Sequence, residues 1–325
     1  MKNKYRWGIL GAGKIADKFC TALDYVEEAE VYAIASRNMD NAKAYAAKYN
    51  ATKCYSNYRD LMADEAVDII YIATSHAFHF EQAMACLQHK KNVVCEKPMT
   101  LSYQQTLALV NAAKENAVFL MEAIWTSCMP FMEKIKSLIQ LDVVGVPQYV
   151  AADFGFFTPF NEESRLFKKL LGGGSVMDVG IYPVFLATAL LGEPSKLKTI
   201  AKLTKTGVDE YCNTVLQYPN GATAHLISSI SFNTAIEAEI SGTKGRIIIQ
   251  NPWFKATEFK VQLNDGTIEK YSMPHQSNGF EHEIREVMYC LDNGLLESSK
   301  MPHQLTLSIS KIMDEMLKQA GVQYE

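Results

Sequence analysis

Short apolar runs alternate with helically spaced apolar positions along the N-terminal part of the chain. The runs predict strands at residues 6–10, 31–36, 68–74, 92–95 and 118–121, and the segments between them predict helices at 14–23, 41–49, 57–62, 80–89 and 103–116. A strand such as Ile69-Ile70-Tyr71-Ile72-Ala73 is apolar at successive positions, so we expect it to be buried on both faces. Strands alternating with helices in this way predict a doubly wound parallel sheet.

The pattern changes after Trp125. Helices are expected near residues 130–139, 175–191, 279–291 and 304–319, the second of them following the turn Gly172-Gly173-Gly174. Alternating apolar and polar runs predict strands at 148–157, 196–205, 211–218, 222–231, 236–241, 246–250 and 259–263. Because Pro219-Asn220-Gly221 and Asn264-Asp265-Gly266 favour hairpins, this half is expected to form an α+β domain with a mostly antiparallel sheet.

Length and composition limit the class of protein. A chain of 325 residues favours two domains, which the change of pattern places at 1–124 and 125–325, with the final helix as a candidate to pack back on the first domain. A net charge of −4 gives no electrostatic reason to expect nucleic acid or a membrane surface as a partner. No apolar stretch is expected to reach the roughly 20 residues of a membrane helix. The seven cysteines show no CxxC pair, so reduced thiols and a cytoplasmic protein are expected.

A glycine-rich segment, Gly11-Ala12-Gly13-Lys14-Ile15-Ala16, follows the first predicted strand and opens the first helix. In this G-x-G-x-x-A spacing, Gly11 allows a tight turn and Gly13 lets the backbone approach a pyrophosphate. The free N–H groups of the helix N-terminus then face the phosphates. The segment therefore predicts a dinucleotide-binding Rossmann domain, and the alternative is a tight turn with no ligand.

The second predicted strand ends at Ser36-Arg37. An acidic residue here usually holds the ribose hydroxyls of NAD, whereas an arginine accommodates the 2′-phosphate of NADP. No Asp or Glu occupies positions 35–39, and Arg37 offers a planar set of donors suited to phosphate. NADP is therefore the expected cofactor, with NAD as the alternative if Arg37 is only a surface residue.

Thr74-Ser75-His76-Ala77-Phe78-His79 follows another strand at its carboxyl end. An H-x-x-H pair invites a metal interpretation, but carboxylate and cysteine ligands at metal spacing are missing beside it, so no metal is expected. The loop is instead predicted to pack along the cofactor. A helix-capping or purely structural role for His76 or His79 is the alternative.

Lys97 stands in Glu96-Lys97-Pro98 at the end of a predicted strand, where a nicotinamide ring and a substrate would meet. Asp178 and Tyr182 are four residues apart and so share one face of a predicted helix. A tyrosine with its reference pKa near 10 needs a nearby cation to act as a base, and a lysine supplies one. The alternative is that the three residues have separate roles: Lys97 as a surface lysine, Asp178 as a helix N-cap and Tyr182 as a core residue.

These motifs together resemble the Gfo/Idh/MocA oxidoreductase family over essentially the whole chain. Segments 35–37, 74–79, 95–98 and 121–125 are similar to its subgroup of dimeric dihydrodiol dehydrogenases and NADP-dependent D-xylose 1-dehydrogenases. The resemblance implies a second domain with an open sheet, often used for dimerisation. It also implies Lys97 and Tyr182 as the catalytic pair beside Asp178, with Trp125, Phe154 and Phe280 lining a substrate pocket.

The resulting expectation is an NADP-dependent dehydrogenase that moves a hydride to or from a hydroxyl-bearing carbon of a sugar or cyclic diol. A homodimer or higher homo-oligomer is expected. The alternatives are a catalytically silent NADP-binding regulator and a reductase of a non-sugar substrate. The expected cofactor contacts are Gly11, Gly13, Lys14, Ile15, Ser36, Arg37, Thr74, His76, His79, Glu96 and Lys97.

Overall fold

The structure is a computed structural model in which residues 4–324 are described. The chain forms two compact units, Met1–Cys128 with His275–Thr306, and Met129–Pro274 with Leu307–Glu325. This division differs from a single boundary at 124/125, because residues 275–306 return to the first unit. The last helix, α9 (His303–Ala320), has most of its residues in the second unit.

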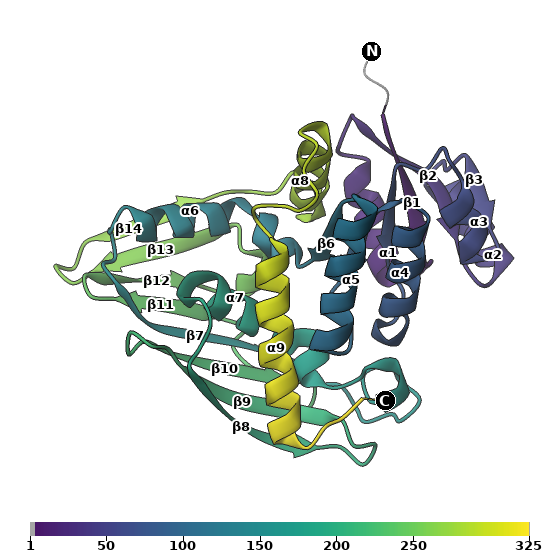
Figure 1. Ribbon diagram of the computed structural model, residues 1–325. Helices are drawn as coiled ribbons and strands as arrows, with labels where there is room; N and C mark the ends of the chain where they lie inside the picture. The colour runs from purple at the N-terminus through teal and green to yellow at the C-terminus, as the bar shows by residue number, and fades with distance from the viewer. Residues whose placement is uncertain (1–3, 325) are drawn as a thin grey trace. The chain divides into compact units, whose positions relative to one another are not determined.

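The first unit is built on a parallel sheet of six strands in the order β3-β2-β1-β4-β5-β6 (Figure 1). Nearly every residue of β1, β4, β5 and the edge strand β6 is buried, which shows that both faces of the sheet are covered. The expected doubly wound sheet is confirmed. The strand bounds are β1 Tyr5–Leu10, β2 Ala29–Ala35, β3 Lys53–Tyr55, β4 Ile69–Ile72, β5 Asn92–Glu96 and β6 Leu120–Ala123.

Helices connect these strands at the positions that the apolar spacing predicts. Asn38, Asn57 and Ser102 cap three of them by accepting backbone N–H groups of the first turn. The segment 275–306 adds α8 (Phe280–Asp292), which packs against α1. The other bounds are α1 Lys14–Leu23, α2 Met39–Lys48, α3 Tyr58–Ala63, η1 His76–Phe78, α4 His79–Gln88, α5 Tyr103–Asn116 and η2 Trp125–Cys128.

The second unit is built on an open sheet of eight strands in the order β14-β13-β12-β11-β7-β10-β9-β8. Only the β7–β10 pair is parallel, so the expected open, mostly antiparallel sheet is confirmed. The strand bounds are β7 Pro147–Gly155, β8 Lys196–Leu203, β9 Asp209–Gln217, β10 Thr223–Ser229, β11 Ala238–Gly242, β12 Gly245–Ile249, β13 Glu258–Leu263 and β14 Ile268–Ser272.

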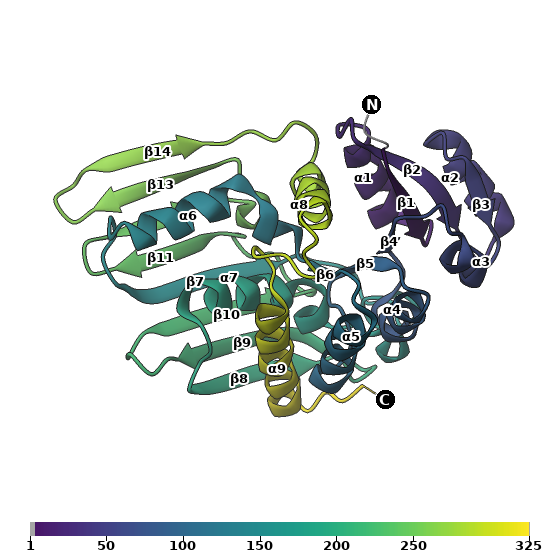
Figure 2. The ribbon, with the colours of Figure 1, turned by 45° about the horizontal axis from the view of Figure 1, so that its top comes forward.

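Helices α6 (Pro130–Gln140), α7 (Ile181–Leu191) and α9 lie along one face of this sheet (Figures 1 and 2). Short 3₁₀ turns occur at η3 Lys169–Leu171 and η5 Trp253–Lys255. The stretch Lys169–Leu191 has the length and apolar content of a membrane helix, which corrects the expectation that no stretch would. Because 78% of that apolar window is buried within the protein, the stretch is a core element.

The expected continuous helix over residues 175–191 is wrong in one respect. Residues Val176–Gly180 wind as a π-helix, and the α-helix α7 begins only at Ile181. Pro183 lies in the first turn of α7, where its missing N–H is tolerated. The same missing N–H removes an α-type hydrogen bond to the preceding turn, which favours the wider winding there.

Candidate active site

The glycine turn between β1 and α1 has the geometry of a phosphate-binding loop. Gly11 has φ +111°, and a Cβ at this residue would lie 2.9 Å from the carbonyl oxygen of Ala73. Gly13 is the N-cap of α1, and a Cβ added there would meet no heavy atom within 4 Å. The first turn of α1, beginning with Lys14 and Ile15, receives no side-chain cap from Gly13. Open space in front of uncapped N–H groups fits a pyrophosphate.

Arg37 follows β2 at the same carboxyl edge of the sheet. Its side chain is exposed, and its guanidinium carbon lies 5.7 Å from the centre of the Phe78 ring. Ser36 is buried, and its hydroxyl oxygen accepts the backbone N–H of Asn38. Because β2 neighbours β1 in the sheet, Arg37 lies beside the strand that carries the glycine turn.

The loop after β4 places Thr74, His76 and His79 at this edge, but His79 turns inward. Its side chain is completely buried, with Nδ1 at 2.8 Å from the Pro98 carbonyl oxygen and Nε2 at 3.1 Å from that of Thr74. His79 thereby joins the loops that follow β4 and β5. The structure favours a structural role for this histidine over direct contact with a cofactor.

Glu96 is the last residue of β5 and Lys97 follows it. The Glu96 side chain is buried, accepts a short hydrogen bond from the Tyr71 hydroxyl, and accepts the Lys97 backbone N–H at 3.2 Å. Burial and the Glu96 charge hold the pKa of Tyr71 well above its ordinary value, so this phenol stays protonated and donates. Glu96 therefore positions the backbone of Lys97, and its side chain faces the protein interior.

A second buried carboxyl group, Glu122 of β6, holds the same loop. Its Oε1 accepts the backbone N–H of Met99 at 2.8 Å. Burial raises the pKa of Glu122 to about 7, although this hydrogen bond and the charge of Lys97 act in the opposite direction. The loop that carries Lys97 is thus fixed from both sides, by Glu96 and by Glu122.

Glu283 of α8 is a third buried acid in this unit. Neither of its carboxyl oxygens has a hydrogen-bond partner among the described residues. Burial, followed by the charge of Glu96, holds the pKa of Glu283 well above its ordinary value. A neutral carboxylic acid is the form that such surroundings favour.

Trp125 and Phe280 form one aromatic stack in the first unit. Their ring centres are 4.2 Å apart with an interplanar angle of 17°. Phe280 also meets Phe19 edge-on at 6.0 Å, and only 1% of Phe280 is exposed. The structure therefore brings these two predicted pocket residues together, with Phe280 buried against the Trp125 ring.

In the second unit, Asp178 lies in the π-helix and Tyr182 in the first turn of α7. The π-helix is fixed by buried Asp209, whose Oδ2 accepts the Ser175 hydroxyl at 2.6 Å and the Val176 N–H at 2.7 Å. Gly174 must be glycine here, because it has φ +109° and a Cβ would lie 2.3 Å from Asp209 Oδ1. Burial raises the pKa of Asp209 to about 6, partly offset by the Ser175 hydrogen bond.

Asp178 has a partner that the sequence analysis missed. The Arg165 guanidinium nitrogen Nη2 donates to Asp178 Oδ1 at 2.8 Å. Arg165 is 13 residues earlier, in the irregular segment between β7 and the triple-glycine turn, so no helical or strand spacing pairs the two residues. Asp209 was also missed, because a polar residue at the start of a strand carries no distinctive signal.

Tyr182 lies in an aromatic cluster with Phe154 of β7 and Phe254. The centre of the Tyr182 ring lies 5.6 Å from that of Phe154 and 5.3 Å from that of Phe254. The two phenylalanine rings stack with their centres 4.4 Å apart. Phe154 was predicted from the resemblance, whereas Phe254 was not. The structure thus brings Asp178, Tyr182 and Phe154 to one region of the second unit.

The parallel sheet and its glycine turn define a protein with a dinucleotide-binding Rossmann domain. The oxidoreductase family with the NAD-binding Rossmann fold matches residues 5–124, and the GFO/IDH/MocA C-terminal domain matches residues 132–248. The chain belongs to the Gfo/Idh/MocA oxidoreductase family, and the resemblance expected from its motifs is confirmed.

Two named relatives cover nearly all of the chain. The trans-1,2-dihydrobenzene-1,2-diol dehydrogenase of Xenopus laevis is 36% identical, over 98% of this chain and 99% of the relative. The enzyme of the same name from Homo sapiens is 31% identical, over 98% of each chain. Both relatives are named as dehydrogenases, which agrees with the oxidoreductase expected from the glycine turn and from Lys97 after β5.

Solved structures share the fold. The 3-ketoreductase KijD10 from Actinomadura kijaniata, in complex with NADP and TDP-benzene, superposes with a TM-score of 0.87 at 24% identity, over 99% of this chain and 100% of that chain. The aldose-aldose oxidoreductase from Caulobacter crescentus, complexed with glycerol, gives 0.89 at 24% identity, over 98% of each chain.

Proposed function

We propose that this protein is an NADP-dependent dehydrogenase acting on a hydroxyl-bearing carbon of a sugar or cyclic diol. One observation carries the proposal: the turn at Gly13, which fits a phosphate, follows the carboxyl end of β1, and Lys97 follows the carboxyl end of β5. The two strands belong to one parallel sheet, with β4 between them. Ligands of doubly wound sheets bind at this edge. The relatives named for a cyclic diol support the substrate class.

The proposed chemistry uses Lys97 and Tyr182, the catalytic pair that the family resemblance implies. When bound, a nicotinamide dinucleotide supplies the acceptor or donor of the hydride. As the substrate C–H hydride leaves, the Tyr182 hydroxyl oxygen, as phenolate, takes the proton of the substrate hydroxyl, and a carbonyl group forms. The Lys97 cation stabilises that phenolate, and Asp178, held by Arg165, orients the substrate.

The preference for NADP rests on Arg37. It is exposed at the end of β2, it lies over Phe78, and no acidic residue competes with it at positions 35–39. The planar donors of a guanidinium suit the 2′-phosphate, which NAD lacks. The NADP complex of KijD10 is a further support, from a protein of the same fold.

A substrate panel tests the proposal. Pentoses, hexoses and cyclic trans-diols are each supplied with NADP, and NADPH absorbance is followed with NAD as the cofactor control. We expect turnover with at least one compound, and loss of turnover without loss of NADPH binding in Lys97→Met. Absence of turnover across the panel, together with NADP binding, would favour a silent regulator instead.

We also propose a homodimer formed through the uncovered face of the eight-stranded sheet. Ile200, Val215 and Tyr149 on β8, β9 and β7 are 67%, 48% and 37% exposed there. Exposed apolar groups on an open sheet face favour association. Light scattering after size exclusion should give a dimer, and Val215→Lys should shift it toward monomer; a monomeric parent protein would refute this proposal.

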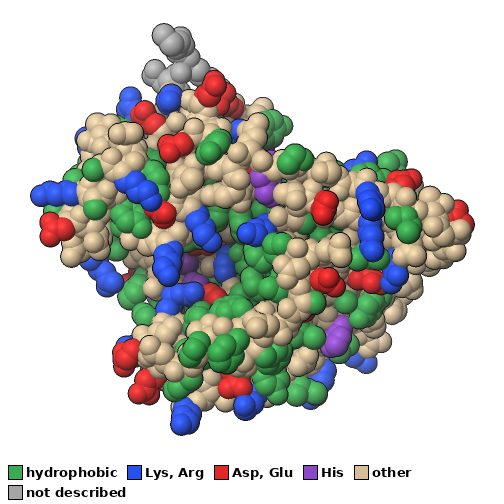
Figure 3. Space-filling model, turned by 180° about the vertical axis from the view of Figure 1, so that it is seen from behind, with side chains coloured by type: hydrophobic (Ala, Val, Ile, Leu, Met, Phe, Trp, Pro, Cys, Tyr) green, Lys and Arg blue, Asp and Glu red, His purple; other side chains and the backbone are tan. Residues whose placement is uncertain are grey.

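The proposed compartment is the cytoplasm. All seven cysteines are free thiols, and six of them are buried. Figure 3 shows both acidic and basic side chains on the visible face. Fluorescence of a tagged chain in its native host would test the compartment, and secretion would contradict it.

A further inference from the structure

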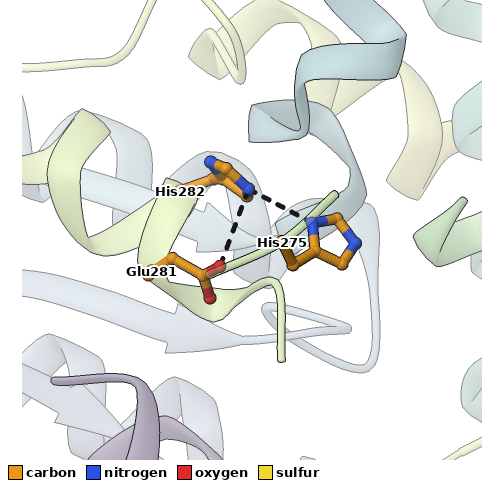
Figure 4. A group of neighbouring side chains, drawn as sticks. All are labelled: His275, Glu281 and His282. Carbon is orange, nitrogen blue, oxygen red and sulfur yellow. Dashed lines mark hydrogen bonds and ion pairs between the residues drawn. The ribbon is translucent and has the colours of Figure 1, made fainter. Parts of the chain in front are cut away.

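Two histidines and a glutamate meet where the chain enters α8. His275 lies in the loop before this helix, and Glu281 and His282 lie in its first turn. One ligand atom from each residue lies within 4.8 Å of the other two. In Figure 4 the His282 imidazole faces both His275 and Glu281. None of these residues belongs to the proposed hydride-transfer machinery.

The spacing of the three groups matches a transition-metal site. His275 Nδ1 and His282 Nε2 are 3.2 Å apart, and His282 Nε2 lies 3.8 Å from Glu281 Oε1. Ligands about 2.0–2.1 Å from a tetrahedral Zn²⁺ are separated by about 3.3 Å. The observed separations therefore require only small side-chain rotations to surround an ion.

Glu281 is already oriented for such a role. Its Oε1 accepts the N–H groups of Gln276 and Ser277, and its Oε2 accepts that of Gly279 at 2.8 Å. A carboxylate has about four lone-pair positions, two on each oxygen, so these three hydrogen bonds leave one, on Oε2, for a metal. Hydrogen bonds of this kind fix the direction of ligating carboxylates in metal sites.

The histidine pair can provide two nitrogen lone pairs without losing a net proton. In the metal-free protein one ring nitrogen donates its hydrogen to the other across the 3.2 Å contact. A change of tautomer moves that hydrogen to the opposite nitrogen of the same ring, and both facing nitrogens then become ligands. Imidazole ligands select Zn²⁺ and related transition metals over Ca²⁺ or Mg²⁺.

We propose that His275, Glu281 and His282 form a Zn²⁺-type metal site with a fourth position open to water. The ion would tie the loop at 275–279 to the first turn of α8. Phe280, which stacks on Trp125, lies between these ligands in the chain, so the metal would also stabilise the backbone behind the proposed substrate-pocket residue Trp125. The site would be structural or regulatory, since hydride transfer itself requires no metal ligand here.

The test uses the full-length, tag-free protein after dialysis against a chelator. Zn²⁺ is titrated in competition with a chromophoric chelator, and Co²⁺ is added separately to report tetrahedral geometry through its visible absorption. We expect one Zn²⁺ per chain, and His275→Ala and His282→Ala should each weaken binding at least about tenfold. His89→Ala is the matched control, because His89 is exposed at the C-terminal end of α4 and lies outside this cluster.

Two further measurements keep the result interpretable. Zn²⁺ should raise the melting temperature of the parent protein and leave that of His275→Ala unchanged. His275 lies outside regular secondary structure, in the loop before α8. NADPH binding is measured on the same samples, so failure of the metal site is distinguished from failure of the proposed function. Unchanged Zn²⁺ affinity in both histidine variants, or no binding at micromolar Zn²⁺, would overturn the proposal.

Discussion

Arg165 Nη2 donates to Asp178 Oδ1 at 2.8 Å, and this pair joins an irregular segment to the π-helix ahead of Tyr182. The Asp178 side chain is 13% exposed, so the ion pair is shielded from solvent on the carboxylate side. Arg165 Nη1 is buried and has no hydrogen-bond partner among the described residues. Arg165 is thus a positioning residue for Asp178.

Arg165→Ala should raise KM and lower kcat together, reducing kcat/KM by about tenfold or more, because a charged hydrogen bond contributes roughly 1.5–3 kcal/mol. Stability should change little, since Arg165 is 40% exposed. Steady-state kinetics with the substrate found in the panel measures the effect. Lys168→Ala, which breaks the exposed pair with Glu163, is the control and should behave as the parent protein. Parent-like kinetics in Arg165→Ala would remove Arg165 from the site.

The two glycines of the cofactor turn should respond differently to alanine. Gly13→Ala places a methyl group in open space at φ −118°, so stability should change by less than about 1 kcal/mol while the Kd for NADPH rises. Gly11→Ala forces alanine to φ +111° against the Ala73 carbonyl and should cost about 1–3 kcal/mol of folding stability. Urea unfolding and fluorescence titration separate the two effects. Unchanged NADPH affinity in a folded Gly13→Ala protein would contradict the assignment of this turn.

Tyr182→Phe removes the proposed base and keeps the ring against Phe154 and Phe254. Loss of general acid–base catalysis should lower kcat by about 10²–10⁴-fold with little change in NADPH affinity. Phe254→Leu is the control for the cluster, because it alters the packing and leaves the hydroxyl. A Tyr182→Phe enzyme with parent kcat would show that another group moves the proton.

Arg37→Ala should lower kcat/KM for NADP much more than for NAD, because only NADP carries the 2′-phosphate. The exposed Lys114 on α5 offers a control for general loss of positive charge. Kinetics with both cofactors at equal ionic strength give the selectivity ratio. Equal losses with NADP and NAD, or none, would refute the role proposed for Arg37.

Glu122 should make folding stability fall as pH rises. Burial raises its pKa to about 7 in the folded protein from the ordinary 4.5, so the native state holds a proton that the unfolded state has released between these pH values. The stabilisation is complete below about pH 4.5 and is lost as pH rises through about 7. The free energy of unfolding, measured with urea at several pH values in this range, should fall less steeply with pH in Glu122→Gln than in the parent protein. The exposed Glu115→Gln is the control. An identical slope in Glu122→Gln would place the titration elsewhere.

Local patterns in the sequence determined most of the elements. The bounds of α5 agree with the expected 103–116, because the Ser102 cap and the helical spacing both act over a few residues. Strands β3 and β14 were not expected. β3 has only three residues, and β14 is a mostly exposed edge strand, so neither offers enough apolar alternation to be recognised.

By itself the sequence determined the two sheets, the glycine turn after β1 and the position of Lys97 after β5, because each depends on residues close together in the chain. Only the tertiary structure decided that His79 and Glu96 turn inward, that Asp209 holds the π-helix, and that Arg165 holds Asp178. It also decided that His275 meets the first turn of α8. The physical reason is that these contacts depend on how the chain folds back on itself, which the period of apolar residues does not specify.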